Sequence, residues 1–215
     1  MKRCMLDLET LGTNPGCIIL SIGAVMFDET TGKLGHEFYM EINQNSCSAA
    51  GLVDDPATLK WWNSQPEAAK KILANTAGDK GAPLSYALAC FTDWLVHNQL
   101  EAEDVELGPD FELNTEIWAC GSDFDTPILT AAYHALGGKV PWKFWNNRCY
   151  RTMKSIFPLH KLTRVGTHHN ALDDAKSQAH HVIQILRAVL PQPAEPKTLW
   201  QSIKEWIKRE SRWAP

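Results

Sequence analysis

Two acidic residues, Asp7 and Glu9, stand two positions apart in the apolar segment "MLDLETLG" at residues 5–12. Side chains two residues apart in a β-strand point to the same face, so we expect the two carboxylates to lie side by side. An amphipathic strand that exposes one face to water explains this octapeptide by itself. Carboxylates this close repel each other unless a cation lies between them. The segment is therefore either a solvent-facing strand or one half of a metal site.

A third acidic residue, Asp125, begins a helical pattern. Leu129, Ala132 and Leu136 follow it at spacings of four, three and four residues, which form a single stripe of an α-helix. Asp123 falls on the opposite side, where we expect it to cap the start of the helix. A carboxylate that faces inward needs a partner, because burial of an unpaired charge is costly. Asp125 is thus a candidate functional residue.

The last long helical pattern, residues 170–190, contains the adjacent pair Asp173 and Asp174. Its expected inward stripe consists of Ala171, Ala175, Ala179, Val182, Leu186 and Val189. At about 100° per residue, Asp174 lies on the flank of that stripe and Asp173 on the solvent side. Helical phase therefore selects Asp174 as the acid that reaches a site, and we expect Asp173 to be a cap or solvated.

His169 lies five residues before Asp174, so the two would not share a helix face. We expect His169 in the loop or first turn that leads into the helix. A histidine with an ordinary pKa of about 6.5 can accept a proton from water near neutral pH. Alone, His169 is equally well explained as a surface histidine, like its neighbour His168.

Taken together, the four acids and the histidine indicate a metal site. Four convergent carboxylates require divalent cations to offset their repulsion, and Mg²⁺ prefers oxygen ligands. Two such ions about 3.5–4 Å apart stabilise both the attacking and the leaving oxygen of a phosphoryl displacement. The set therefore predicts metal-dependent phosphoryl chemistry at Asp7, Glu9, Asp125, Asp174 and His169.

Composition and charge narrow the class of protein. The chain has 215 residues, 44% of them hydrophobic, which is typical of one globular core. The net charge of −4 argues against a protein that coats nucleic acid by bulk positive charge. No apolar run approaches the roughly 18 residues of a membrane span, and the N-terminus does not resemble a signal peptide. The six cysteines lack paired short spacing, which predicts reduced thiols in a cytoplasmic protein.

Periodicity predicts a mixed α/β domain around these residues. Strands are expected at residues 3–8, 17–27, 34–42 and 115–120, the second and third joined by a turn at "DETTGK". Helices are expected from Pro56 and over residues 83–99, 123–137 and 170–190. We expect one catalytic domain over residues 1–190. Residues 191–215 are expected to form a stiff proline-rich linker and a basic amphipathic helix that docks on the same domain.

Three motifs resemble the DEDD superfamily of 3′–5′ exonucleases in its histidine subtype (DEDDh), which includes proofreading exonuclease subunits and ribonuclease T. They are "DLET" at residues 7–10, "FD" at 124–125 and "HNALDDA" at 169–175, of which the last is the most specific. The similarity spans roughly residues 3–190. The segments "TLKWW" and "RCYRTM" make the chain most similar to the small bacterial and phage exonucleases.

This resemblance implies a ribonuclease H-like mixed sheet, with antiparallel strands 1–3 plus parallel strands, flanked by helices. It also implies two Mg²⁺ or Mn²⁺ ions and release of nucleoside 5′-monophosphates from a free 3′ end. By the family's pattern the metal ligands are Asp7, Glu9, Asp125 and Asp174, and His169 is the general base. Many relatives have an asparagine where this chain reads "ACGSDFD", which affects a local substrate contact.

Seven further residues are candidates for substrate contact. The resemblance places Thr10 near the 3′-hydroxyl and Leu11 against the terminal base. Adjacent tryptophans cannot both be core in a helix, so one of Trp61 and Trp62 is expected to stack on a base. Aromatic residues interleaved with cations at residues 142–154 suit a single-strand channel, although core aromatics with solvated charges explain that segment equally well. The expected phosphate contacts are Arg148, Arg151 and Arg164.

Two other classes of protein share some of these features. The loop "LDLETLG" is similar to the DxDxT loop of haloacid-dehalogenase-type phosphatases, but their late acidic pair follows a strand, whereas "LDDA" lies in an alanine-rich helix. A non-catalytic binding module would be expected to lose an acid or the histidine, yet all five are present. The sequence leaves open whether single-stranded DNA or RNA is the substrate (an exoribonuclease is the alternative), and whether the chain forms a homodimer.

Overall fold

The computed structural model describes residues 2–104, 106–108, 111–121 and 123–190. The expected linker and C-terminal helix therefore lie outside the described residues. The strands are β1 (Arg3–Thr10), β2 (Ile19–Asp28), β3 (Lys33–Glu41), β4 (Glu116–Ala119) and β5 (Asn147–Cys149). They form one sheet in the order β3-β2-β1-β4-β5. The first three strands are antiparallel, whereas β4 runs parallel to β1 and β5 parallel to β4, which confirms the predicted mixed sheet.

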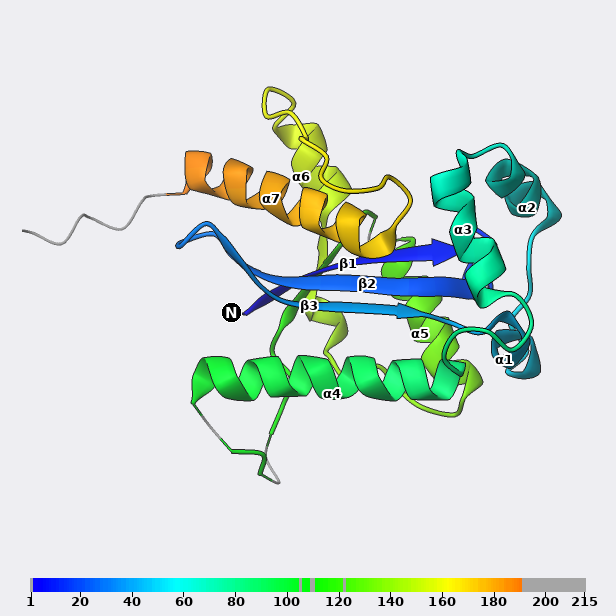
Figure 1. The fold of residues 1–215 in the computed structure, drawn as a ribbon. Helices are drawn as coiled ribbons and strands as arrows, with labels where there is room; N and C mark the ends of the chain where they lie inside the picture. The colour runs from blue at the N-terminus through cyan, green and yellow to red at the C-terminus, as the bar shows by residue number, and fades with distance from the viewer. Residues whose placement is uncertain (1, 105, 109–110, 122, 191–215) are drawn as a thin grey trace, which may run out of the picture.

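Helices cover both faces of this sheet. They are α1 (Gln44–Ala49), α2 (Pro56–Asn63), α3 (Glu67–Thr76), α4 (Leu84–Glu103), α5 (Asp125–Ala135), α6 (Tyr150–Ile156), α7 (Ala171–Val189) and a short 3₁₀ turn, η1 (Phe144–Asn146). Figure 1 shows α7 on one face and α4 and α5 on the other, with α2 and α3 beyond the end of β1. The sheet is therefore the middle layer of three, as expected for an α/β domain.

The alternation of β1 determines where its carboxylates point. Leu6 and Leu8 belong to the core on the side of α4 and α5, whereas Met5 packs in the cluster under α7. Asp7 and Glu9 continue the series of Met5 at intervals of two, so they point to the α7 side. The predicted shared face of the two acids is thus the face covered by α7.

Gly23 allows α7 to approach the sheet closely. This residue is paired with Asp7 across β1 and β2. A Cβ atom at Gly23 would lie 2.2 Å from the backbone of Ala171 and Leu172, so a larger residue cannot be accommodated without moving the helix. The first turn of α7 therefore rests directly on the strand beside Asp7, which brings Asp174 to the same place.

Some local expectations were wrong. Strand β5 and helices α1, α3 and α6 lie in segments for which no element was expected. Asp123 does not cap α5: Phe124 is at the N-cap position without a side-chain hydrogen bond, and Asp123 lies 3.6 Å from Arg151 instead. Leu136 and Val189 were expected to face inward but are 43% and 45% exposed, because each lies at the C-terminal end of its helix.

All six cysteines are free thiols, and three of them are buried. None of the described helices has the length and apolar character needed to cross a bilayer.

Candidate active site

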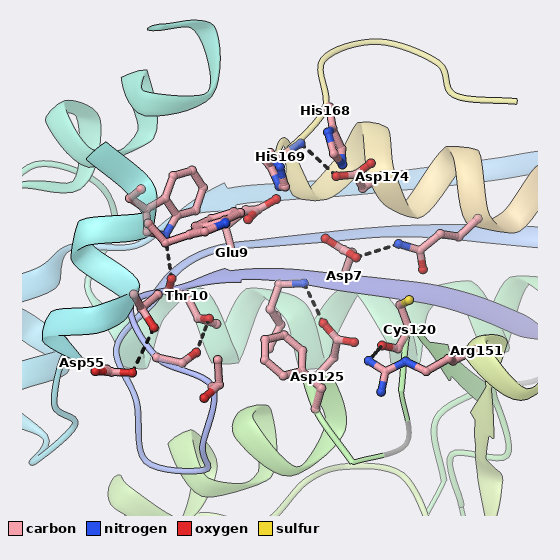
Figure 2. A pocket seen from close by; sticks show the side chains of 18 of the residues that line it. Asp7, Glu9, Thr10, Asp55, Cys120, Asp125, Arg151, His168, His169 and Asp174 are labelled. Carbon is pink, nitrogen blue, oxygen red and sulfur yellow. Dashed lines mark hydrogen bonds between the residues drawn. The ribbon is translucent and has the colours of Figure 1, made fainter. Parts of the chain in front are cut away.

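The five residues that the sequence selected line one cavity of about 690 Å³. It opens where β1 and β4 end and where α5 and α7 begin, and Figure 2 shows the five side chains around it. Asp7 and Glu9 come from β1, and Asp125 is the first residue of α5. Asp174 lies in the first turn of α7, and His169 lies in the loop before it. Residues more than 160 positions apart thus meet in one site.

Three of the carboxylates converge closely. One oxygen each of Asp7, Glu9 and Asp174 lies within 4.8 Å of the other two. Glu9 and Asp174 are each only 7% exposed, whereas Asp173, the neighbour of Asp174, is half-buried. Helical phase therefore separated the adjacent acids correctly, because α7 turns Asp174 toward the sheet and Asp173 away from it.

Asp125 presents an unpartnered oxygen to the same site. It is 1% exposed, and its Oδ1 accepts a hydrogen bond of 3.1 Å from the backbone N–H of Leu8. Its Oδ2 is buried and has no hydrogen-bond partner among the described residues. A buried carboxylate oxygen without a partner is costly, so this atom is a ready ligand for a cation.

Burial raises the pKa of Asp7, Glu9 and Asp125, and repulsion between acids adds to this effect for Asp7 and Glu9. Burial, followed by the charges of Asp125, Glu9 and Asp174, raises the pKa of Asp7 well above its usual range. Burial, followed by the charges of Asp174 and Asp125, raises the pKa of Glu9 to about 8. Burial raises the pKa of Asp125 to about 7. A cation that replaces these protons removes the repulsion, so the oxygen-only donor set fits Mg²⁺ or Mn²⁺.

The first turn of α7 holds the loop that carries His169. Asn170 caps the helix by accepting from the N–H of Asp173 at 3.1 Å, and Asp173 accepts from the N–H of Thr167 at 2.7 Å. Gly166, at φ +66°, passes so close to Asp173 that a Cβ would lie 2.1 Å from its carboxylate. Asp173 therefore anchors the loop, and this contact replaces the capping or solvated role expected for it, since the helix cap is Asn170.

His169 itself adopts a left-handed backbone conformation with φ +62°. Its backbone N–H donates to Oδ2 of Asp174 at 2.9 Å. Its ring lies edge-on to the Trp61 ring, with the ring centroids 4.9 Å apart. Burial, and then the neighbouring His168, lower the pKa of His169. The imidazole is therefore neutral at neutral pH and able to accept a proton.

The three arginines have different surroundings. Arg164 forms an ion pair with Asp174 and lines the cavity. Arg151 also lines the cavity and donates to the carbonyl oxygen of Cys120 at 2.9 Å. Arg148 does not line it, because its guanidinium is paired with Glu116, at the first residue of β4, at 2.9 Å.

The two tryptophans divide as expected. Trp62 is 1% exposed, and its Nε1 donates to the carbonyl oxygen of Thr10 at 2.8 Å. Trp61 is 43% exposed and lines the cavity. Thr10 lines the cavity too, whereas Leu11 is 2% exposed in the core and does not.

Several lining residues were not singled out from the sequence. Gln178 donates from its side-chain amide to Asp7 at 2.7 Å. It follows Asp174 by four residues, so the same helical phase that selected Asp174 could have found it. Cys120, Asp55 and His168 also line the cavity, and no sequence pattern distinguished them.

Comparison with known proteins identifies a family and a fold. Residues 2–186 match the family model described as the Rv2179c-like 3′-5′ exoribonuclease domain. No curated protein matches the chain significantly. Among solved structures, the nuclease domain of 3′hExo, a DEDDh family member bound to rAMP, is 15% identical with a TM-score of 0.53, over 91% of this chain and 96% of that one.

A second solved structure, Escherichia coli exonuclease I in complex with an oligonucleotide, is 13% identical with a TM-score of 0.50. The match covers 89% of this chain and 42% of that one. At such identities the likeness shows the fold alone, which is the predicted ribonuclease H-like sheet of DEDDh exonucleases.

Proposed function

Because the chain belongs to the Rv2179c-like 3′-5′ exoribonuclease domain family, and is therefore a 3′–5′ exonuclease, we propose that it hydrolyses single-stranded RNA from a free 3′ end to nucleoside 5′-monophosphates. One observation carries the assignment: four buried or half-buried acids and one histidine converge on a single cavity. The family description supports RNA over DNA, and single-stranded DNA stays the alternative substrate.

The four acids would hold the divalent cations that this chemistry needs. Asp7, Glu9, Asp125 and Asp174 would bind two Mg²⁺ or Mn²⁺ ions. Such ions, when bound, stabilise the charge that develops on the attacking and leaving oxygens. Two observations support this metal binding: Oδ2 of Asp125 has no hydrogen-bond partner among the described residues, and the pKa values of Asp7 and Glu9 are raised. Each observation indicates that the protein alone does not compensate the negative charge of these carboxylates.

His169 would act as the general base. A ring nitrogen takes a proton from the attacking water while the water oxygen bonds to phosphorus. The P–O3′ bond breaks, and the shortened strand leaves with a 3′-hydroxyl whose proton comes from solvent. The lowered pKa of His169 keeps the imidazole neutral and able to accept a proton. The hydrogen bond from the backbone N–H of His169 to Asp174 holds the loop in place.

The cavity wall suggests how the strand is held. Trp61 exposes its ring to the cavity, where a terminal base can stack, and Thr10 lies on the same wall near the proposed 3′-hydroxyl. Arg151 and Arg164 lie at the cavity and are proposed phosphate contacts. Leu11 and Arg148 are left out of this set because neither side chain lines the cavity.

The test is a gel assay on 5′-labelled RNA and DNA of one sequence, with Mg²⁺, Mn²⁺ or EDTA. We expect a metal-dependent ladder that shortens from the 3′ end, with RNA cleaved faster than DNA. The variant Asp7→Ala is the control for a contaminating nuclease and should be inactive. Faster cleavage of DNA would refute the RNA assignment.

Two other results would refute the exonuclease activity itself, and not only the preference for RNA over DNA. Cleavage inside the strand would refute the polarity. Absence of cleavage in both substrates would leave a binding module or a phosphatase, which hydrolysis of small phosphate esters then distinguishes. Whether the chain forms a homodimer, which the sequence leaves open, is a separate question that sedimentation of the full chain tests.

A further inference from the structure

We propose that His168, His169 and Asp174 form an additional metal site, selective for a borderline transition-metal ion such as Zn²⁺, and that its occupancy inhibits hydrolysis. The site shares Asp174 with the four acids but differs from them in its donor atoms. Its capacity to bind metal rests on geometry alone. Its inhibitory effect also rests on the function proposed above for His169.

The three side chains are already close to one another. One ligand atom of each lies within 4.8 Å of the other two. The imidazole rings of His168 and His169 are stacked, with centroids 3.8 Å apart and an interplanar angle of 27°. Figure 2 shows both rings beside the Asp174 carboxylate. Zinc bonds of about 2.0–2.2 Å in a tetrahedron place donors roughly 3.3–3.6 Å apart, so the donor atoms are close enough in distance. A nitrogen lone pair lies in the plane of its ring, so the exposed His168 ring must rotate out of the stack to point at the same ion as His169.

The ring nitrogens of this pair are available. Among the described residues, none donates to or accepts from a ring nitrogen of His168 or His169. His181, by contrast, uses both ring nitrogens: one contacts the Tyr150 hydroxyl at 2.8 Å and the other the carbonyl oxygen of His160 at 2.8 Å. Availability therefore distinguishes the pair from the buried histidine of α7.

The Asp174 carboxylate can supply the third ligand. Its Oδ1 is paired with Arg164, and its Oδ2 accepts the N–H of His169. Each carboxylate oxygen retains a further lone pair, and the Arg164 side chain is 48% exposed and so is free to rotate toward solvent. A metal bound here would replace Arg164 as the cation beside Asp174.

The donor set determines which ion is preferred. Two imidazole nitrogens and one carboxylate oxygen suit Zn²⁺ and similar ions, whereas Mg²⁺ prefers oxygen ligands alone. A nitrogen bonded to a metal cannot take a proton from water. Zinc at this site would therefore remove His169 as a base, and excess Mg²⁺ at the four acids would not fully restore the rate.

Calorimetry tests the site without reference to activity. Zn²⁺ is titrated into the untagged full chain in saturating Mg²⁺, for the wild type, His168→Gln and the matched control His180→Gln, which changes an exposed histidine on α7. We expect wild type and His180→Gln to bind alike and His168→Gln to bind at least about tenfold more weakly, since even loss of an outer-sphere partner costs roughly 10–100-fold. Equal affinity of wild type and His168→Gln would overturn the proposal.

Visible spectra with Co²⁺ provide a second readout, which reports the coordination number of the bound ion. The intense absorption of four-coordinate Co²⁺ should appear in the wild type and be absent from His168→Gln. Its presence at equal strength in both proteins would also overturn the proposal.

RNA cleavage with added Zn²⁺ then tests inhibition, each protein being compared with its own zinc-free rate. Half-inhibition of His168→Gln should need at least about tenfold more Zn²⁺ than that of the wild type. If wild type binds Zn²⁺ through His168 but cleaves RNA at an unchanged rate, the inhibitory role is overturned. If the wild type does not cleave RNA even without Zn²⁺, the proposed function fails, while calorimetry still decides the metal site.

Discussion

Gln178 donates a hydrogen bond of 2.7 Å from its side-chain amide to Oδ1 of Asp7, which lies 171 residues earlier in the chain. Gln178 and Asp174 are four residues apart on α7, so one helix face supplies both a carboxylate to the cavity and the partner that orients the carboxylate of β1. This bond also lowers the pKa of Asp7, against the larger effect of burial.

Replacement of Gln178 should therefore weaken metal binding. In Gln178→Leu, Oδ1 of Asp7 loses its donor, and we expect Mn²⁺ affinity and activity to fall roughly 10–100-fold. Calorimetry with Mn²⁺ measures the affinity. Lys176→Ala is the matched control. Lys176 forms an ion pair of 2.7 Å with Glu37, and neither residue lines the cavity. Unchanged Mn²⁺ affinity in Gln178→Leu would show that Asp7 is oriented without it.

The adjacent acids of α7 should differ sharply on substitution. Asp174→Asn should abolish turnover by removal of a proposed metal ligand. Asp173→Ala removes only the acceptor of the Thr167 N–H, so we expect a loss of about 1 kcal/mol in the free energy of unfolding and retention of most activity. Urea unfolding and steady-state rates measure the two effects. Equal inactivity of both variants would mean that the loop, and not the ligand, limits the rate.

His169 should determine the pH dependence of hydrolysis. The base must be neutral, so the rate should rise as pH rises through the pKa of His169, which lies below its usual 6.5. His169→Ala should lose about 10²–10⁴-fold in rate together with this ascending limb. Single-turnover rates over about pH 4.5–8 provide the profile. Retention of the limb in the variant would assign it to another group.

The stability of the metal-free protein should fall as pH rises. The pKa of Glu9 is raised from 4.5 to about 8 on folding, so the folded state binds the proton more tightly than the unfolded chain. The associated stability is fully present below about pH 4.5 and is lost as pH rises through about 8. Thermal unfolding in EDTA should therefore show a declining Tm across this range.

Added Mg²⁺ should reverse that decline, because the cation offsets the charge that the lost proton uncovers. We expect the increase in Tm on addition of Mg²⁺ to be larger at about pH 8 than at about pH 5.5. The variant Glu9→Gln cannot titrate at this position, so its metal-free Tm should depend less on pH. An identical pH dependence in wild type and variant would exclude Glu9 as the cause.

The two tryptophans should separate binding from stability. Trp61→Ala should raise KM for RNA about 5–150-fold, the equivalent of about 1–3 kcal/mol for a lost stacked base, with an unchanged Tm. Trp62→Ala removes a side chain that is 1% exposed and should cost about 3–5 kcal/mol of stability. Oligonucleotide cleavage and thermal unfolding measure the pair. An unchanged KM in Trp61→Ala would remove it from the substrate contacts.

Much of the site was predictable because its signals are local. The strand period of two places Asp7 and Glu9 on one face, and the helical period of 3.6 separates Asp174 from Asp173. The same logic placed Asp125 on the inward stripe of α5, where it is 1% exposed. Backbone geometry alone sets these relationships, so they are encoded within a few residues of sequence.

Other expectations failed where the outcome depends on what packs nearby. The cap expected at Asp123 is absent, because that carboxylate is drawn to Arg151 instead. Arg148 and Arg151 lie three residues apart in one cationic segment, yet only Arg151 reaches the cavity. Arg148 is held by Glu116 on the neighbouring strand, a pairing that no local pattern encodes.

The sequence by itself determined the set of acids, the histidine and the fold class, since periodicity and motif spacing depend on near neighbours in the chain. Tertiary structure alone decided that Gln178 orients Asp7, that Trp61 is exposed at the cavity while Trp62 is buried, and that His168 joins His169 beside Asp174. Each of these contacts joins different elements or depends on the path of a loop, and such contacts are set by the packing of the whole domain.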